Sequence, residues 1–372
     1  MSATNNLTNT AVSNSGEVDS LLIEKYIGKV KERVIKNENL RRFFDVQSVT
    51  GTDMVSEKFM GGSATVQVLA PGEDPEASVA QYEKSALRVD TMLLSRYAEA
   101  IFHKVQSDIE GNQSKLAKMQ GDEMLRIDDS MLVQQLVHSA LSHTATAMDN
   151  KPRVDGQGFS QDVQIADTQA ADPNSLLATI EYLHEQMVTE GEYSDGVDES
   201  GLYCLIRWPE FNALRDAERI VNQDYVDFAG NTISGFVLKS LNLPVIPTRR
   251  FPRVGSTDTS KEAALTRIKG KGSALLSNAS NGYRYTPTAD QTLAFAVIFN
   301  EEALLVGETM PLDGDIFFDK RSKSFLIDTW QSAGAIGSNW ESVGVARKGA
   351  ASANATITAR AKRKAKPVTQ IS

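Results

Sequence analysis

The sequence has very little of the chemistry on which most enzymes and metalloproteins depend. Its 372 residues include one cysteine and four histidines. The single Cys204 excludes an intramolecular disulfide and any cysteine-rich zinc or iron–sulfur site. Cys204 lies in an apolar stretch, and His138 and His143 do not have the i, i+4 spacing of a helical metal pair. We therefore predict neither a cysteine nucleophile nor a metal-binding histidine.

Long apolar runs are also missing. The longest, Leu293 to Phe299, is far shorter than the ~20 residues of a membrane-spanning helix. The N-terminal residues show no basic region followed by an apolar segment, so we expect no secretory signal. With 41% hydrophobic and 23% charged residues, the composition is typical of a soluble, folded protein made in a reducing compartment.

No catalytic motif is present either. The sequence contains no Gly-x-Ser-x-Gly elbow and no dinucleotide-binding glycine pattern, and Gly270-Lys271-Gly272 lacks the residues of a phosphate-binding P-loop. Two acidic clusters lack the spacing of a calcium loop: Asp195, Asp198 and Glu199, and Asp313, Asp315 and Asp319. We predict no enzyme activity, no cofactor and no metal. The alternative of an enzyme whose carboxylates meet only in three dimensions stays open.

Charge is missing from one end of the chain and unbalanced at the other. Residues 1–16 carry no charged side chain, and residues 342–372 carry no Asp or Glu but seven Lys or Arg. Because the whole chain carries −9, the remainder carries −16. A basic tail can neutralise phosphates or bind an acidic neighbouring subunit. For nucleic-acid or subunit contact the candidates are Arg360, Lys362, Arg363, Lys364 and Lys366.

Two alternating stretches predict a long β-hairpin. Residues Ala64 to Leu69 and Ala86 to Leu94 alternate as strands do, and two prolines and a glycine in Ala70 to Pro75 indicate a turn. Two strands are only marginally stable in water, so something should pack on them. Both a hairpin on its own domain and an arm over a neighbour remain open.

The rest of the chain predicts a mixed α and β body. An apolar stripe indicates a helix over Gly121 to Ser142, followed by a loop over Thr144 to Ala171. Asp172-Pro173 is typical of a helix start, as is Trp208-Pro209, whose helix would carry Val221 on its apolar face. We expect strands at Leu202–Ile206, Leu243–Thr248, Leu293–Phe299 and Val343–Ala346, and a hairpin over Asp315–Trp330 that turns at Asp319–Lys323.

This order of segments resembles the major capsid proteins of tailed bacteriophages with the Hong Kong 97 (HK97-like) fold. The closer likeness is to short-tailed podoviruses of the T-seven-like group. The residues that carry it are Gly62-Ser63-Ala64, Ala70-Pro71-Gly72-Glu73, Glu83-Lys84, Val89-Asp90, Leu93-Leu94, Gln120-Gly121-Asp122-Glu123-Met124-Leu125, Ile327-Asp328, Gly334 and Val343-Gly344-Val345.

The resemblance implies an α+β fold with an N-terminal arm, an extended β-hairpin loop, a peripheral domain with a spine helix, and an axial α/β domain. The corresponding ranges are 1–55 for the arm, 56–95 for the extended loop, 96–171 for the peripheral domain, 172–310 for the axial domain, 311–346 for the return to the peripheral domain, and 347–372 for the basic tail.

The implied function is structural. A major capsid protein assembles into hexamers and pentamers of an icosahedral shell that encloses double-stranded DNA without reading its sequence. The implied partners are further copies of the chain, a scaffolding protein, a portal protein at one vertex and a possible decoration protein. The implied location is the virion, assembled in the host bacterial cytoplasm, with no membrane contact.

Shell assembly requires contacts between copies, and the hairpin is the expected place for them. The residues predicted to contact a neighbouring subunit are Val66, Val68, Leu69, Pro71, Glu73, Val89, Met92 and Leu93. An alternative with the same fold is an encapsulin-type nanocompartment, whose shell is small and holds cargo rather than DNA.

Overall fold

Over the residues that it describes, the computed structural model has a mixed α and β architecture with three sheets, of four, seven and two strands. No helix in the part of the chain it describes is long and apolar enough to cross a membrane. The described residues are 26–31, 40–52, 54–61, 68–69, 74, 81–100, 109–142, 161–189, 201–226, 232–252, 285–338 and 342–365.

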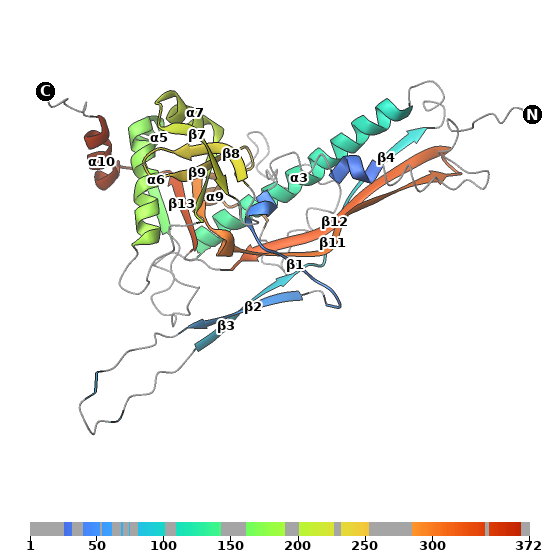
Figure 1. Cartoon of the computed structure of the whole chain (residues 1–372), viewed down its shortest axis with the longest axis horizontal. Helices are drawn as coiled ribbons and strands as arrows, with labels where there is room; N and C mark the ends of the chain where they lie inside the picture. Colours follow the sequence, from blue (N-terminus) through green and yellow to red (C-terminus); the bar gives the residue numbers. More distant parts are fainter. Residues whose placement is uncertain are drawn as a thin grey trace, which may run out of the picture.

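The seven-stranded sheet forms one end of the molecule (Figure 1). Successive side chains along its strands point to opposite faces and pack in two apolar clusters. Cys204 and Ile298 pack toward helix α6 (Pro173–Val188), whereas Leu205 and Val297 pack toward helix α3 (Ile109–Ser142). The sheet is therefore buried on both faces, as the continuous apolar strands predict. In spatial order the strands are β5 (Gln161–Ile165), β13 (Val343–Lys348), β10 (Ala294–Phe299), β6 (Tyr203–Arg207), β9 (Leu243–Thr248), β8 (Thr232–Leu238) and β7 (Ile220–Val226).

The two helix starts predicted from proline are confirmed. Asp172 caps α6, where its carboxylate accepts hydrogen bonds from the backbone N–H groups of Asn174 and Ser175. Helix α7 (Trp208–Asp216) has Pro209 in its first turn. Val221 lies in β7 rather than on α7, so its predicted place was wrong, because α7 already ends at Asp216.

The loop predicted over Thr144 to Ala171 was wrong in its second part. Residues 161–165 form β5, a parallel partner of β13, and helix α5 (Asp167–Ala171) follows it. Polar composition hid this strand because β5 lies at the edge of the sheet, where only alternate side chains are buried.

Helix α3 connects the two larger sheets. Its 34 residues correspond to a length of about 50 Å, and it lies against β12, β13 and β10. The predicted end at Ser142 is confirmed, but the helix begins at Ile109 rather than Gly121. Its first turns are polar and give no apolar stripe, whereas Leu132, Val133 and Leu136 are buried.

The four-stranded sheet runs away from the seven-stranded one along α3 (Figure 1). Its hairpin is confirmed and is longer than predicted, and Asp319 closes the turn by accepting hydrogen bonds from the Arg321 and Ser322 backbone N–H groups. Helix α3 covers one face of the sheet. In spatial order the strands are β1 (Val46–Ser48), β11 (Leu304–Asp319), β12 (Ser324–Gly337) and β4 (Leu93–Ala100).

The two-stranded sheet projects from this body (Figure 1). Strands β2 (Met54–Gly61) and β3 (Gln81–Arg88) pair antiparallel. The single strand predicted over Ala86 to Leu94 was wrong: β3 ends at Arg88, and β4 begins a different sheet at Leu93. Val68 and Leu69 lie outside any strand, and the rest of the strand predicted at 64–69 lies outside the described residues.

The short elements complete the fold. The basic tail predicted over 347–372 includes a helix, α10 (Ala355–Ala365), which packs on α6 through Ile357 and Ala361. Residues 26–31 are helical. Further short helices among the described residues are η2 (Leu40–Phe43), α9 (Ala289–Thr292) and η4 (Glu301–Ala303).

Candidate assembly surfaces

The base of the projecting hairpin is fixed to the four-stranded sheet by close packing. Leu87 and Val89 are buried in a cluster with Val49 and Leu305. They lie directly above Gly307, where an added Cβ would come within 2.9 Å of Leu87 Cδ2. The absence of a side chain on Gly307 lets the hairpin approach the sheet, so its direction is set by the subunit itself.

Two residues predicted to contact a neighbour are used inside the chain instead. Val89 is 6% exposed and Leu93 is 9% exposed. Leu93 packs with Met124 and Met131 of α3 and with Tyr285. The prediction needs correction for these two positions because they cover the subunit's own core, which leaves them little surface to offer.

Other predicted contact residues are exposed. Val68 is 97% exposed, Met92 53% and Leu69 43%, although each side chain is apolar. Isolated exposed apolar residues are ordinary, and these three lie in two places, between β2 and β3 and just before β4. Val66, Pro71 and Glu73 lie outside the described residues.

The sequence reasoning missed a second apolar surface on the four-stranded sheet. Helix α3 covers the face that carries Ile316 and Ile327, while Leu94 and Phe317 on the opposite face are 47% and 37% exposed. Register places Leu94 opposite Trp330 and Phe317 opposite Leu326, so these side chains share one face. The sequence of β4 carries no periodic signal for this face, because the open side of the strand holds Leu94, Arg96 and Ala98 together.

A charged pair lies in the middle of this open face. Arg96 on β4 is paired with Asp328 on β12, with Arg96 Nε 2.7 Å from Asp328 Oδ1. The Arg96 guanidinium also lies 5.6 Å from the centre of the Phe317 ring. The hydrogen bonds to Asp328 raise the pKa of Arg96, so Arg96 stays charged. The open face therefore carries an ion pair between the apolar side chains of Leu94 and Phe317.

The segment before β1 is anchored to α3 and β11 by a buried cluster of charges. Arg41 donates to Glu308 Oε1 at 2.8 Å and to Asp128 Oδ1 at 2.9 Å, and the Leu40 backbone N–H donates to Asp129. Burial acts to lower the pKa of Arg41, but the charge and hydrogen bonds of Asp128 and Glu308 outweigh it and raise the pKa. These charge-assisted hydrogen bonds attach the segment before β1 to residues of α3 and β11 that are distant in the sequence.

The basic residues of α10 divide into paired and exposed groups. Arg360 Nη1 lies 2.5 Å from Glu185, and Lys364 Nζ lies 2.5 Å from Glu181, both on α6. Lys362 and Arg363 are exposed. Lys366 lies outside the described residues. Arg360 and Lys364 therefore help to hold the helix in place, and the exposed pair remains for other contacts.

Cys204 and His138 are two of the described groups with catalytic potential. Cys204 is fully buried, and burial raises the pKa of its thiol to about 12, which opposes formation of a nucleophilic thiolate. His138 Nδ1 accepts a hydrogen bond from Gln291 Nε2 at 3.0 Å. Among the described residues no group of three or more His, Cys, Asp or Glu side chains is arranged to hold a metal ion.

Comparison with known proteins identifies the fold of this chain. No family model matches the sequence, and no curated protein matches it. Among solved structures, the mature capsid of bacteriophage PhiM1 aligns with a TM-score of 0.60 over 83% of this chain and 86% of that chain, at 15% identity. The capsid of cyanophage P-SCSP1u aligns with a TM-score of 0.60 over 82% and 86%, at 14% identity.

The chain has the HK97-like fold. In this fold the seven-stranded sheet, the long helix α3 and the long hairpin β11–β12 occupy one continuous body. The α+β fold expected from the resemblance is therefore confirmed. At this low identity the likeness concerns the fold, and function requires separate support.

Proposed function

We propose that this chain is the major capsid protein of a tailed bacteriophage. It would assemble into hexamers and pentamers of an icosahedral shell around double-stranded DNA. The observation that carries the proposal is the match to two phage capsid subunits over more than four fifths of each chain. Two exposed apolar surfaces on the described residues support it, because a shell subunit must leave surface for its neighbours.

We assign the parts of the chain as the resemblance implies. Residues 1–55 are the arm, 56–95 the extended loop, 96–171 and 311–346 the peripheral domain, and 172–310 the axial domain. Strands β2 and β3 support the extended loop, although β4 already begins at Leu93.

The contact surface of the extended loop is narrower than the sequence alone predicts. Val68, Leu69 and Met92 would pack on a neighbouring copy, since they are apolar and exposed in the single chain. Val66, Pro71 and Glu73 stay as sequence predictions for the same contact. Lys362, Arg363 and Lys366 would contact nucleic acid or a neighbouring subunit, while Arg360 and Lys364 hold α10.

We further propose the partners and location of such a subunit. A scaffolding protein would guide assembly, a portal protein would occupy one vertex, and a decoration protein could bind outside. The protein would assemble in the bacterial cytoplasm and end in the virion, with a T-seven-like podovirus as the source. The alternative of an enzyme with a carboxylate site is not part of this proposal, in which Arg96–Asp328, Arg360–Glu185 and the turn at Asp319 serve the structure.

Sedimentation of the purified protein followed by negative-stain electron microscopy tests this proposal. The experiment is run with and without a candidate scaffolding protein. Closed shells or ring-shaped capsomers are expected. Small shells filled with cargo protein would favour an encapsulin-type compartment instead. A 40.6 kDa monomer under every condition would contradict both the capsid proposal and the encapsulin-type alternative.

The variant Leu69→Asp tests the contact surface itself. Leu69 is 43% exposed, so a carboxylate there should leave the isolated chain folded, with an unchanged far-UV circular dichroism spectrum. Burying that charge between subunits should abolish shells in the micrographs. Leu69→Met, which keeps an apolar side chain, is the matched control and should assemble normally. Normal particles from Leu69→Asp would remove the hairpin from the proposed interface.

A further inference from the structure

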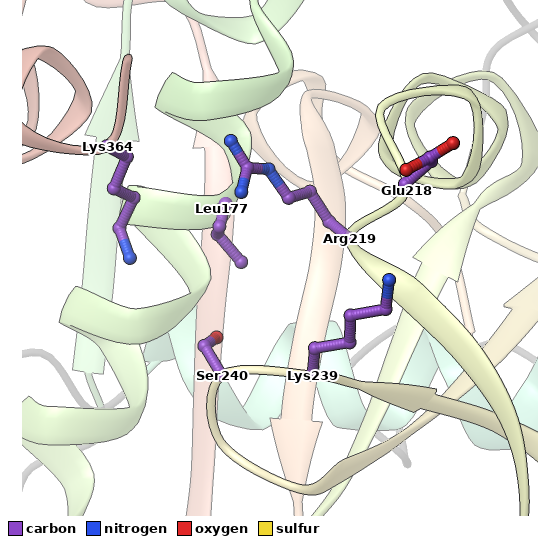
Figure 2. A pocket seen from close by; sticks show the side chains of 6 residues that line it. All are labelled: Leu177, Glu218, Arg219, Lys239, Ser240 and Lys364. Atoms are coloured by element: carbon purple, nitrogen blue, oxygen red, sulfur yellow. The ribbon is translucent and has the colours of Figure 1, made fainter. Parts of the chain in front are cut away.

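A cavity of about 220 Å³ lies between α6, α10 and the ends of β7 and β8 (Figure 2). It is far from the projecting hairpin, and neither the sequence motifs nor the fold assigns it a role (Figure 1). Three of its lining residues are cationic and one carries a hydroxyl group. The lining residues are Leu177, Glu218, Arg219, Lys239, Ser240 and Lys364.

Two of the cations are fixed by neighbouring backbone segments. Arg219 follows the turn that ends α7, and Lys239 follows β8. The Lys239 backbone N–H donates to the Arg219 carbonyl at 3.1 Å, and the Arg219 N–H donates to the Leu214 carbonyl at 3.0 Å. Glu218 has φ of 56°, a left-handed conformation that is uncommon for a residue with a side chain. The turn therefore brings the backbones of Arg219 and Lys239 together at the edge of the cavity, while their side chains extend in different directions (Figure 2).

The positive charge of the cavity is only partly neutralised. Lys364 is paired with Glu181, but Arg219 Nη2 donates to the neutral amide oxygen of Asn174 at 2.8 Å. Within the described part of the chain no carboxylate pairs with Lys239, and the buried Arg219 Nε has no acceptor. A buried N–H without an acceptor is unfavourable, so an added oxyanion would be stabilised here.

The side chains point in a way that suits an anion. Figure 2 shows four polar side chains arranged around Leu177: the Arg219 guanidinium lies above it, the Lys364 side chain runs down one side, Ser240 lies below, and the Lys239 ammonium group lies on the other side. The Glu218 carboxylate is directed away from Arg219 and Lys364 (Figure 2). The one acidic residue that lines the cavity therefore does not fill it.

We propose that this cavity binds a phosphate group. The planar guanidinium of Arg219, an ammonium group and a hydroxyl group together offer donors in several directions, as a tetrahedral oxyanion requires. The volume exceeds the needs of a single carboxylate, and exposed Lys362 and Arg363 on α10 extend the positive charge beyond the cavity. The phosphate can be inorganic phosphate or a phosphodiester of a nucleic acid. The proposal holds whether or not the chain forms a shell.

Two binding measurements on the full-length protein separate these sources. Inorganic phosphate is titrated and followed by ³¹P NMR line width, and a fluorescently labelled single-stranded oligonucleotide is followed by anisotropy. Binding of phosphate alone assigns the site to the free anion. Binding of both, with phosphate displacing the oligonucleotide, assigns it to the phosphodiester as well.

Variants connect binding to the cavity. Lys239→Gln should weaken binding about tenfold, since a hydrogen bond to a charged group contributes about 1.5 kcal/mol. Ser240→Ala should weaken it by a smaller factor, and it removes only a hydroxyl group, so its folding should be unaffected. Lys320→Gln makes the same charge change at an exposed turn of the β11–β12 hairpin and should bind as the wild type does.

Three results would overturn the proposal. The first is no binding of either probe at low ionic strength. The second is equal loss of binding in Lys239→Gln and Lys320→Gln, which would indicate only net charge. The third is a short poly-glutamate peptide that binds in a Lys239-dependent manner more tightly than phosphate does, which would make the cavity a carboxylate site.

Discussion

The two larger sheets of this protein differ in how completely the chain covers them. The seven-stranded sheet is packed on both faces, by α6 and by α3, and every residue of β10 is buried. The four-stranded sheet is packed on one face, and Leu94 and Phe317 are exposed on the other. Composition contributes to the contrast, because β10 is entirely apolar, whereas β4 and β11 carry charged residues such as Arg96 and Asp315 between the apolar ones.

We expect the seven-stranded sheet to stabilise the single subunit and the four-stranded sheet to contribute to contacts between subunits. A sheet covered on both faces can be stable in a single subunit. A sheet with an open apolar face is stable only in part and gains from a neighbour that covers it. If the two sheets have these two roles, substitutions in the first should unfold the chain, and substitutions in the second should affect contacts between copies.

The largest effect should come from truncating a core aromatic residue. Phe299 on β10 is fully buried, and its ring centre lies 5.3 Å from that of Phe44 and 5.9 Å from that of Tyr203. Phe299→Ala should cost about 3–5 kcal/mol in the free energy of unfolding, measured by urea denaturation. The matched variant Phe317→Ala on the open face should cost less than about 1 kcal/mol and reduce assembly instead. Equal losses of stability would refute the contrast between the sheets.

Breaking the buried charge cluster should have the next largest effect. Asp128→Ala leaves Arg41 buried and without its nearest carboxylate, which should cost about 3 kcal/mol in the same assay. The double variant Arg41→Met with Asp128→Leu removes both charges and should recover most of that loss. A double variant as unstable as the single one would mean that Arg41 acts through packing rather than through charge.

A smaller effect is expected where the hairpin meets the four-stranded sheet. Gly307→Ala would bring a methyl group within 2.9 Å of the Leu87 side chain and 3.3 Å of Val49, which should cost about 1–2 kcal/mol. Adding Leu87→Val should recover part of the loss, because the shorter side chain makes room. Thermal unfolding of the three variants measures this, and a stable Gly307→Ala would show that the hairpin base moves easily.

The smallest effect concerns the helix α10 and depends on pH. The hydrogen bond and charge of Arg360 lower the pKa of Glu185, so the folded state favours the ionised carboxylate. The stabilisation is therefore present at pH 7 and is lost as the pH falls below the ordinary value of 4.5 and through the lowered one. Glu185→Gln should melt slightly below the wild type at pH 7, and the difference should shrink as the pH falls below 4.5 and through the lowered pKa of Glu185. A difference that grows on acidification would contradict this ion pair.

Local signals in the sequence were sufficient for the elements with strong patterns. The cap at Asp172, the start at Trp208-Pro209, the apolar strand at Tyr203–Arg207 and the turn at Asp319 are all where the pattern indicates. Each depends on residues next to one another, such as a side chain that caps the following turn. Elements with weak patterns, such as β5 and the start of α3, were missed because their stability comes from distant partners.

The candidate contact surface was predicted only in part, for a related reason. Alternation along the hairpin identified apolar residues, but it could not separate Leu69, which is exposed, from Val89, which packs above Gly307. That distinction depends on residues more than 200 positions apart in the chain. The cavity beside α10 depends in the same way on Arg219, Lys239 and Lys364, which share no motif.

By itself, the sequence predicted the fold: mixed α and β patterns in an order of segments that resembles HK97-like capsid proteins, with few reactive side chains. The tertiary structure decided which apolar residues stay exposed, which charges are paired, and where cationic side chains of different elements line one cavity. The physical reason is that secondary structure follows from neighbouring residues, whereas burial and charge pairing depend on residues that only the folded chain brings together.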